Sequence, residues 1–564
     1  MNLTTRRAAA AAMFAGLAVS TASAQIFQRE IGDISDEWSY SVDTTEDGGS
    51  VSAGYKRVNG LGSEFHVIKY FPDGTTEWEV TFGGEGEDIA YSVQETKDGG
   101  YIVAGESTSF GTGFEIVLLR LDAGGTQLWS YAYEGSFMAD PIHAPHPGVA
   151  LDQGDEGEIY VVGHRASPTG FPFSTPVAFR TDSIGTLEWY NEYVVPTPFQ
   201  EFPELAFTDI AYSPLDRTAV ISGTIRADFP LDPNDPTFLG RTQDATLLKV
   251  TADDFAGAAP GGAPVWFFRY DSLFDRDNPD LPNVWETGDG LDVFREGDII
   301  LAGRTDLGLA PSGTYRSTHL VHVDAGGGPI WSVDYESFGV DGTPSTVATA
   351  YAAVEFDERR DAFVQAGRIT SASGGGVNAH TQLTAFGGAP IWSWRYGLDD
   401  FRTYAESVQP SIECGYTYAG RIDNPNPPSG LGRGDHYLVA NNDDGMTGCL
   451  EEEVFVEPVA PLRPRELPIQ FDDRFEFLQL PNLTRPVDGF NFALCFDPDC
   501  DPGTGPCNAA DIAPPFGVLD LDDVNAFIVA FFAMTPAADI APPFGVWDLD
   551  DINLFIAAFL AGCP

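Results

Sequence analysis

Lysine is nearly absent from this chain of 564 residues, which contains only Lys56, Lys69, Lys97 and Lys249. Lysine and arginine together number 30, against 84 aspartates and glutamates, and the formal net charge is −54. A surface this negative repels phosphate backbones and anionic lipids, so neither nucleic acid nor an acidic membrane is expected as a partner. The charge suits salty water, which screens self-repulsion, and it suits divalent cations.

Long apolar runs are also missing. The stretch AAAAAMFAGLAV is too short to cross a bilayer, and no later stretch is long enough. It follows the Arg6-Arg7 pair and precedes Ala22-Ser23-Ala24, a pattern typical of a signal peptide and its cleavage site. We therefore expect residues 1–24 to be a signal peptide. The mature protein is expected to be secreted and extracellular or associated with the cell surface, with no membrane span.

Catalytic motifs are lacking as well. The sequence has no G-x-S-x-G elbow, no H-E-x-x-H zinc motif and no phosphate-binding loop, and its eight histidines are scattered. Two carboxylates could serve a glycosidase, but 84 acidic residues produce many pairs by chance. The sequence therefore favours a protein that is not an enzyme, and it leaves a polysaccharide hydrolase or lyase as the alternative.

One recurring unit accounts for residues 27–449, and its clearest copy is DIAYSVQETKDGGYIVAGES…FEIVLLRLDAGGTQLWSYAYEG. Four short runs of alternating, β-branched or aromatic residues are separated by turns rich in Gly and Asp. Such a unit predicts four antiparallel strands, named a to d in chain order.

The strongest mark of the unit is a turn glycine followed by two aromatic residues on strand d. Trp and the aromatic four positions later share one face of a strand, so both are predicted to pack between neighbouring sheets rather than to bind a ligand. The six copies of G-x-x-x-W-x-x-x-aromatic are Gly74/Trp78/Phe82, Gly125/Trp129/Tyr133, Gly185/Trp189/Tyr193, Gly262/Trp266/Tyr270, Gly327/Trp331/Tyr335 and Gly388/Trp392/Tyr396.

A second mark, a glycine at the end of strand b, occurs seven times. These residues are Gly54, Gly105, Gly163, Gly223, Gly303, Gly367 and Gly420. The missing seventh d-strand is found at the N-terminus, where Phe27 aligns with the Trp position and Ile31 with the second aromatic position. This count predicts a mainly β protein whose residues 25–449 form a seven-bladed β-propeller closed by the N-terminal strand.

The unit resembles the repeats of a large class of secreted bacterial propellers, which share the pattern D-G-G-Y-I-V-A-G…D-x-x-G-x-x-x-W. This resemblance implies the fold and little about activity.

Candidate ligand-binding residues follow the b-strand glycines. Arg304, Arg368, Arg421 and His164 are expected on the face that also carries the long d–a and b–c loops. Three arginines there could hold a carboxylate or sulfate of a glycan or another anionic ligand through forked hydrogen bonds. The alternative, favoured by the excess of acids, is that each arginine pairs with a nearby carboxylate. The acids that begin strand a, Asp88 and Asp209 among them, are expected to cap turns.

Residues 450–506 break the repeat and form an acidic, Pro-rich segment. EPVAPLRPRELP predicts an extended linker, and FEFLQLP with FNFALC can form one small β-hairpin. Export permits disulfides, and six cysteines allow fifteen pairings among which the sequence alone does not choose. The positions of the cysteines suggest three pairs, with unpaired thiols as the alternative for Cys414 and Cys449. These pairs are Cys414 with Cys449, Cys495 with Cys500, and Cys507 with Cys563.

The C-terminal tail, residues 507–564, contains two related segments, ADIAPPFGVLDLDDVNAF and ADIAPPFGVWDLDDINLF. The apolar residues behind each segment have helical spacing, which predicts two packed helices. The tail resembles a dockerin of the variant that ends in Gly-Cys, a small all-α domain built from a degenerate EF-hand pair. The resemblance implies non-covalent attachment to a cohesin-like or other surface scaffold protein.

Each segment keeps only the second half of a calcium loop. With Gly517 and Gly545 at the sixth loop position, the late ligand positions are aspartates, but the early ones are Pro and Phe. Calcium is the expected cofactor, and a calcium-free helical hairpin is the alternative. The candidate ligands are Asp511, Asp520, Asp522, Asp523, Asp539, Asp548, Asp550 and Asp551.

The sequence as a whole favours a secreted, non-catalytic binding propeller that the tail attaches to a scaffold or cell surface. The alternatives are a propeller-type polysaccharide hydrolase or lyase delivered to a cellulosome-like assembly, and a structural surface-layer component.

The tail yields a first prediction. Residues 507–564, immobilised on a resin, should retain a cohesin module because the helix stripes of a dockerin are present. Pull-downs with and without EDTA separate docking from calcium binding. Failure to retain any cohesin in either buffer would remove the attachment role.

Overall fold

The computed structural model describes residues 26–447 except for gaps at 34, 59–61, 112–113, 137–148, 167–173, 196–203, 233–234, 253–259, 273–284, 307–315, 339–348, 371–376, 398–401, 412–414 and 424–433. It further describes the backbone of seven short strands between residues 451 and 497, and the single positions Phe531 and Ile552. The expected signal peptide and all eight candidate calcium ligands lie outside the described residues, as does every candidate disulfide cysteine except Cys495, of which only the backbone is described.

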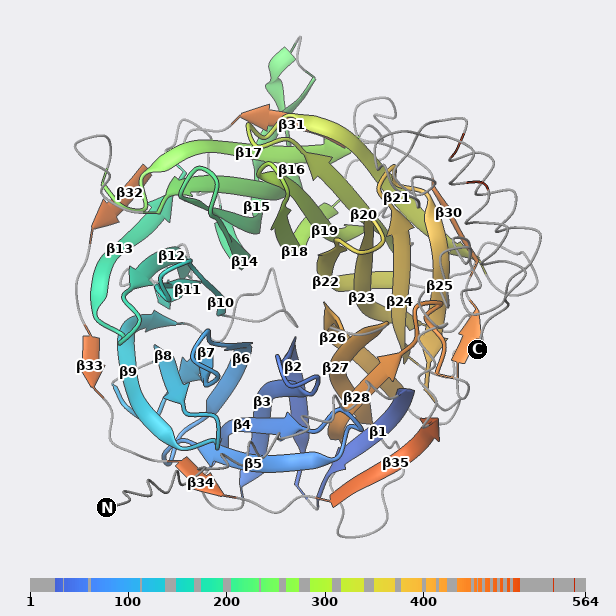
Figure 1. The fold of residues 1–564 in the computed structure, drawn as a ribbon. Coiled ribbons are helices and arrows are strands. Elements are labelled where there is room, and N and C mark those ends of the chain that lie inside the picture. Colours follow the sequence, from blue (N-terminus) through green and yellow to red (C-terminus); the bar gives the residue numbers. More distant parts are fainter. Residues whose placement is uncertain are drawn as a thin grey trace, which may run out of the picture.

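Seven blades of antiparallel strands surround a central axis as a β-propeller (Figure 1), and a single parallel bridge, Gln243 to Trp285, joins blades 4 and 5 into one sheet. The predicted mainly β fold and the number of blades are therefore confirmed. In each blade strand a is innermost and strand d lies near the rim. No helix among the described residues has the length and hydropathy needed to cross a membrane.

The first four blades contain strands β2 to β17. These are β2 (Glu37–Thr44), β3 (Ser50–Val58), β4 (Gly62–Tyr70) and β5 (Thr76–Phe82) in blade 1; β6 (Asp88–Glu95), β7 (Tyr101–Ser107), β8 (Phe114–Leu121) and β9 (Gln127–Ser136) in blade 2; β10 (Ala150–Gln153), β11 (Ile159–Ala166), β12 (Ser174–Thr181) and β13 (Leu187–Val194) in blade 3; and β14 (Glu204–Ser213), β15 (Thr218–Asp232), β16 (Asp235–Thr251) and β17 (Pro264–Ser272) in blade 4.

The remaining blades contain strands β18 to β28 and the first strand of the chain. These are β18 (Trp285–Phe294), β19 (Asp298–Asp306), β20 (Arg316–Val323) and β21 (Pro329–Phe338) in blade 5; β22 (Thr349–Asp357), β23 (Ala362–Thr370), β24 (Val377–Ala385) and β25 (Pro390–Tyr396) in blade 6; and β26 (Arg402–Pro410), β27 (Tyr416–Asp423), β28 (Gly434–Asn441) and β1 (Ile26–Gly32) in blade 7.

The apolar core of the described residues is divided into seven clusters, one between each pair of adjacent blades. Between blades 2 and 3, for example, Ile116 and Leu118 pack with Val161 and Phe179, all fully buried. Burial of each sheet face therefore requires the neighbouring blade, so the fold is stable only as a closed ring.

The two aromatic positions of strand d join each blade to the next. Tyr335 donates a hydrogen bond from its hydroxyl to the carbonyl oxygen of Gly388 at 2.8 Å, and Trp331 donates from its indole nitrogen to Phe386 in the same turn at 2.9 Å. Gly388 has φ of +85°, and a Cβ there would lie 3.3 Å from the Trp331 ring. The same tyrosine-to-glycine bond recurs from Tyr133, Tyr193, Tyr270 and Tyr396. The interpretation of these aromatics as packing residues is confirmed.

The N-terminal strand closes the ring, as the sequence predicts. Strand β1 pairs antiparallel with β28, with Phe27 opposite Ala440 and Ile31 opposite His436. The Phe27 ring lies against Gly74, as Trp78 lies against Gly125 one blade further on. Arg29 donates from Nη2 to the carbonyl oxygen of Asp73 at 2.7 Å, which replaces the indole hydrogen bond that five of the other blades form with the next turn.

Residues 451–497 differ from the expected linker, because they supply a fifth strand to every blade (Figure 1). The segment runs around the rim in reverse order, from blade 6 down to blade 1 and then to blade 7. Its strands are β29 (Glu451–Glu453), β30 (Phe455–Pro458), β31 (Leu462–Glu466), β32 (Gln470–Asp473), β33 (Phe477–Gln479), β34 (Thr484–Pro486) and β35 (Phe490–Asp497).

The expected hairpin between FEFLQLP and FNFALC does not form. Strand β33 pairs with β9 in blade 2, and β35 pairs with β1 in blade 7. The outer edge of each d-strand presents unpaired backbone groups, and this rim segment supplies their partners. Proline is tolerated because each added strand is an edge strand, as Pro464 shows in β31.

The turn glycines yield a prediction about stability. Replacing Gly388 by alanine should lower the free energy of unfolding by about 1–3 kcal/mol, because φ of +85° disfavours a side chain. Urea denaturation of the full chain measures the difference. The adjacent Gly387 has no atom within 4 Å of its would-be Cβ, so Gly387→Ala is the matched control and should stay within about 0.5 kcal/mol. Equal effects of the two substitutions would contradict the role of the turn.

Candidate functional site

A β-bulge recurs in the innermost strand of six blades, opposite the b-strand glycine. A bulge adds one residue to the strand and redirects its side chain. The extra residues are Tyr40, Tyr91, Thr208, Asp289, Ala352 and Glu406.

The bulge explains why strand b requires glycine. A Cβ on Gly54 would lie 1.7 Å from the carbonyl oxygen of Trp38, and one on Gly420 would lie 2.0 Å from that of Tyr404. The backbone of strand a therefore approaches too closely for any side chain at these positions. The glycine that recurs at the end of strand b is therefore required by the bulge in strand a, which pairs with it.

The innermost strands line a central cavity of about 250 Å³, named the channel cavity. Bulge residues such as Tyr40, Asp289 and Glu406 line it together with residues further along the same strands. Five further carboxylates line the cavity, from five different blades: Asp43, Asp152, Asp209, Asp292 and Glu355.

These five carboxylates connect neighbouring blades. Asp209 accepts a hydrogen bond from the backbone N–H of Leu291 at 3.0 Å, and Asp292 accepts one from Phe356 at 2.9 Å. Asp43 and Asp152 accept equivalent bonds from the next blade, and Glu355 accepts from the Gln409 side chain at 2.9 Å. Each carboxylate thus has a donor in the protein, which gives it a structural role independent of any ion.

Burial raises the pKa of these groups. It raises the pKa of Asp43 and of Asp209 to about 7, and that of Asp292 to about 6. Burial also raises the pKa of Asp152 and of Glu355, and the other carboxylates of the cavity raise the pKa of Glu355 further. The channel cavity therefore changes charge near neutral pH.

The identical pentapeptides DIAYS occupy different positions in their blades. Asp88 pairs with Ser107, before the bulge, and it accepts hydrogen bonds from Gly84 N at 2.9 Å and from the Ser109 hydroxyl at 2.7 Å. Asp209 pairs with Ser222, after the bulge, and lines the cavity. The predicted turn role therefore fits Asp88 and is wrong for Asp209, because a bulge shifts register without leaving a mark in the sequence.

The candidate arginines gather around one carboxylate at the end of the cavity near Tyr40. All three lower the pKa of Glu406, although burial is the larger effect and raises it. Arg304 pairs with Asp289 at 3.0 Å, and Arg421 pairs with Asp423. For these two residues the expected pairing with a carboxylate is observed, with strand residues as the partners.

Arg368 differs from the other two arginines. Its guanidinium lies over the ring of Tyr404, 5.9 Å from the centroid, and it forms no ion pair with another described residue. Arg368 is only partly buried. Among the described residues it is therefore the one arginine of this group without an ion-pair partner.

Partly exposed aromatic side chains surround the arginines. Trp38 stacks on Tyr40 with centroids 5.3 Å apart, and it contacts Tyr55 and Tyr404 at 6.4 and 6.0 Å. The Arg421 guanidinium lies 4.2 Å from the Trp38 ring centroid. The three arginines, Glu406 and these four aromatics are named the mouth cluster: Arg304, Arg368, Arg421, Glu406, Trp38, Tyr40, Tyr55 and Tyr404.

His164 does not contribute to the mouth cluster. It is 3% exposed, and its Nε2 accepts a hydrogen bond from the backbone N–H of Phe207 in blade 4 at 3.1 Å. Sequence reasoning found the residues that follow the b-strand glycines, the arginines and Tyr55, but it missed Glu406, Trp38, Tyr40 and Tyr404, which lie on strand a of their blades. These residues could be found only by their position opposite or next to the glycine of strand b, and that position depends on the register in which strands a and b pair.

Neither a family model nor a curated protein matches the sequence. Among solved structures, the polysaccharide lyase Uly1 is similar at 11% identity and a TM-score of 0.42 over 72% of this chain and 90% of that one. A PL25 ulvan lyase is similar at 10% identity and a TM-score of 0.38 over 74% and 97%. The architecture of this chain is established by its own strand pairing, and likenesses of this size say nothing about what it binds or cleaves.

The raised pKa of Asp209 yields a prediction about pH. Its carboxyl is protonated in the folded state up to about pH 7, whereas the unfolded value is near 3.8. Between these values the folded state binds the extra proton, so this group lowers stability as pH rises, by up to about 1.4 kcal/mol per pH unit. Asp209→Asn removes the ionisation, so this variant should gain stability relative to wild type as pH rises from 5 to about 8.

Urea denaturation at several pH values measures this difference. Asp444→Asn, which neutralises an exposed turn carboxylate, is the control and should run parallel to wild type. A pH profile of Asp209→Asn that also parallels wild type would show that Asp209 is ionised throughout.

Proposed function

We propose that the propeller is a non-catalytic binding module that recognises acidic saccharides at the mouth cluster. The observation that carries the proposal is Arg368, a partly buried guanidinium without an ion-pair partner among the described residues, beside partly buried aromatic rings. A guanidinium binds carboxylate or sulfate in a forked geometry, and aromatic faces pack against sugar rings.

The charges of the mouth cluster support selectivity for an anion of limited charge. Arg304 and Arg421 are already balanced by Asp289 and Asp423. When they are ionised, Glu406 and the channel carboxylates would repel a polyanion that entered the cavity. A saccharide with a single uronate or sulfate group avoids this repulsion. Its acidic group reaches Arg368 while its sugar ring lies on the aromatic side chains of the mouth cluster.

Export and attachment complete the proposal. The signal peptide over residues 1–24 would deliver the chain outside the cell, and the dockerin-like tail would join it to a cohesin-like or other surface scaffold protein. Calcium bound by the tail aspartates is part of the same proposal. These parts are supported by the sequence alone.

A polysaccharide hydrolase or lyase is the second candidate, and Glu406 favours it. Burial raises the pKa of this carboxyl, and its Oε1 atom is buried without a hydrogen-bond partner among the described residues. A carboxyl that stays protonated can act as a general acid.

A binding assay tests the proposal. The full chain should bind uronate-containing or sulfated oligosaccharides on a glycan array, and neutral ones more weakly. Arg368→Gln should weaken acidic binding roughly 10–100-fold, because one charge-assisted hydrogen-bond pair is lost. Isothermal titration with the best array ligand gives the affinity.

Lys97→Gln is the control for this assay. It removes an exposed cation in the turn between β6 and β7, at the opposite end of the blades, and should leave affinity unchanged. Equal binding of neutral and acidic sugars, or full affinity in Arg368→Gln, would refute the proposal. Mass spectrometry of the incubated oligosaccharides would reveal cleavage products if the second candidate is correct.

A further inference from the structure

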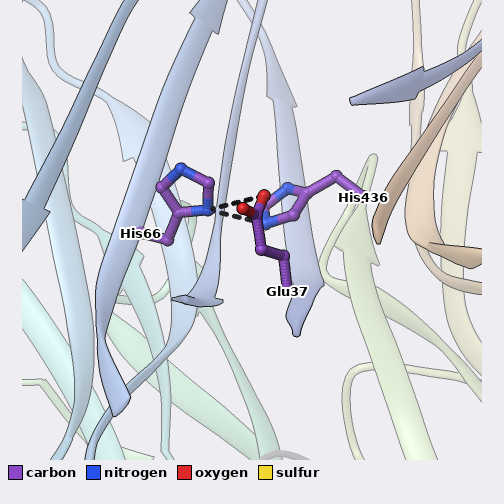
Figure 2. Close-up of side chains that lie close together, drawn as sticks. All are labelled: Glu37, His66 and His436. Carbon is purple, nitrogen blue, oxygen red and sulfur yellow. Dashed lines mark hydrogen bonds and ion pairs between the residues drawn. The ribbon is translucent and has the colours of Figure 1, made fainter. Parts of the chain in front are cut away.

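Three potential metal ligands meet in the seam where the ring closes. Glu37 comes from β2 and His66 from β4 of blade 1, and His436 comes from β28 of blade 7. Their exposed fractions are 1%, 0% and 1%. Figure 2 shows the two imidazole rings and the carboxylate directed toward one another. Two histidines and one carboxylate are a common ligand set for zinc and other transition metals.

The distances between the donor atoms fit a single ion. His66 Nδ1 lies 3.0 Å from His436 Nε2 and 3.7 Å from Glu37 Oε2, and one donor atom of each residue lies within 4.8 Å of the others. Ligands of a tetrahedral zinc ion, each about 2.0–2.1 Å from the metal, are separated by about 3.3 Å. The two measured distances lie on either side of this value.

The surrounding residues orient these donors. Glu79 Oε1 lies 2.6 Å from His66 Nε2 and accepts a hydrogen bond from its N–H, which places the lone pair of His66 on Nδ1, the atom directed at His436 Nε2 3.0 Å away. Lys56 Nζ lies 2.7 Å from Glu37 Oε1, which leaves Oε2 directed at the histidines. A carboxylate behind a histidine is the usual outer support of a metal ligand.

Without a metal, the carboxylates in the seam between blades 1 and 7 carry more negative charge than the one lysine beside them can balance. Among the residues that the structure describes, none forms a hydrogen bond with Glu37 Oε2, although Glu37 is 1% exposed. Asp33, Glu37 and Glu79 surround the single ammonium of Lys56, at 3.0, 2.7 and 3.3 Å. Three carboxylates and one ammonium leave two negative charges, which one divalent cation neutralises. An uncompensated buried charge is strongly destabilising.

We propose that the seam between blades 1 and 7 binds one divalent transition-metal ion of the zinc class through Glu37 Oε2, His66 Nδ1 and His436 Nε2, with a water molecule as fourth ligand. The ion links the first complete blade to the last one. It therefore reinforces the one interface at which the d-strand comes from the opposite end of the propeller sequence.

The other blades show why this seam is special. His319 and His380 lie opposite a b-strand glycine, as His66 does. His436 lies in the blade before that of His66, opposite the residue after the b-strand glycine. The corresponding residues are Ala245 in the blade before that of His319 and Thr318 in the blade before that of His380. His380 instead bonds to the Ser393 hydroxyl at 2.7 Å. In the described part of the propeller, a second ligating histidine is therefore found only beside His66.

Metal titration of the full chain tests the proposal. The protein is stripped with EDTA, dialysed into excess calcium to occupy any site in the tail, and titrated with Zn²⁺ in a calorimeter. About one equivalent should bind, and the thermal unfolding midpoint should rise. Co²⁺ should give a visible spectrum without a thiolate charge-transfer band, because the ligands contain no sulfur.

Two variants locate the site. His436→Ala should no longer bind the one equivalent of Zn²⁺, and Zn²⁺ should no longer raise its thermal unfolding midpoint. Glu79→Gln leaves all three ligands in place and should weaken Zn²⁺ binding about 10–100-fold, which keeps the proposal testable if His436→Ala does not fold. His380→Ala, a buried histidine of another seam, is the control. It should lower the midpoint but keep the binding.

Each other outcome overturns the proposal. If folded wild-type protein binds no Zn²⁺, the cluster is a hydrogen-bond network that links Glu79, His66 and His436 without a metal. If binding survives in His436→Ala, or if cobalt shows a thiolate band, the metal is bound elsewhere in the chain.

Discussion

Each blade of this propeller is held to the next by aromatic residues of its strand d, which pack on a glycine in a turn of the neighbouring blade. The tyrosine hydroxyl bonds to that glycine, and the tryptophan ring occupies the space that a Cβ would need, as Tyr335, Trp331 and Gly388 show. Because the apolar core lies between blades, no blade is stable without its neighbours. The contact therefore sets both the spacing of the blades and the closure of the ring.

The inner end of each blade depends on a second recurrent constraint, the bulge in strand a. It brings a carbonyl oxygen so close to strand b that only glycine fits at Gly54 and its equivalents. It also directs one extra side chain into the channel, and this position carries Tyr40 in blade 1 and Glu406 in blade 7. The same scaffold feature thus supplies the residues that distinguish one blade from another.

The seam between blades 7 and 1 departs from the repeat because strand d of blade 7 is β1, which comes from the N-terminal end of the propeller sequence. Phe27 and Arg29 replace tryptophan and its indole hydrogen bond, and Ile31 has no hydroxyl to offer. The seam contains instead a dense polar group around Lys56, His66 and His436. A segment between residues 451 and 497 adds an outer strand to every blade, this one included. Closure therefore depends on polar and backbone interactions more than it does elsewhere in the ring.

The sequence by itself determined the number of blades, the strand pattern, the packing role of Trp and Tyr, and the N-terminal closure, because these depend on local spacing that repeats along the chain. Only the tertiary structure decided the rest. The two copies of DIAYS fall in different registers because a bulge leaves no mark in the sequence. His66 and His436 lie 370 positions apart and meet only because the ring closes. The rim strands are too short and too rich in proline to reveal partners that are determined by which blade edges are exposed.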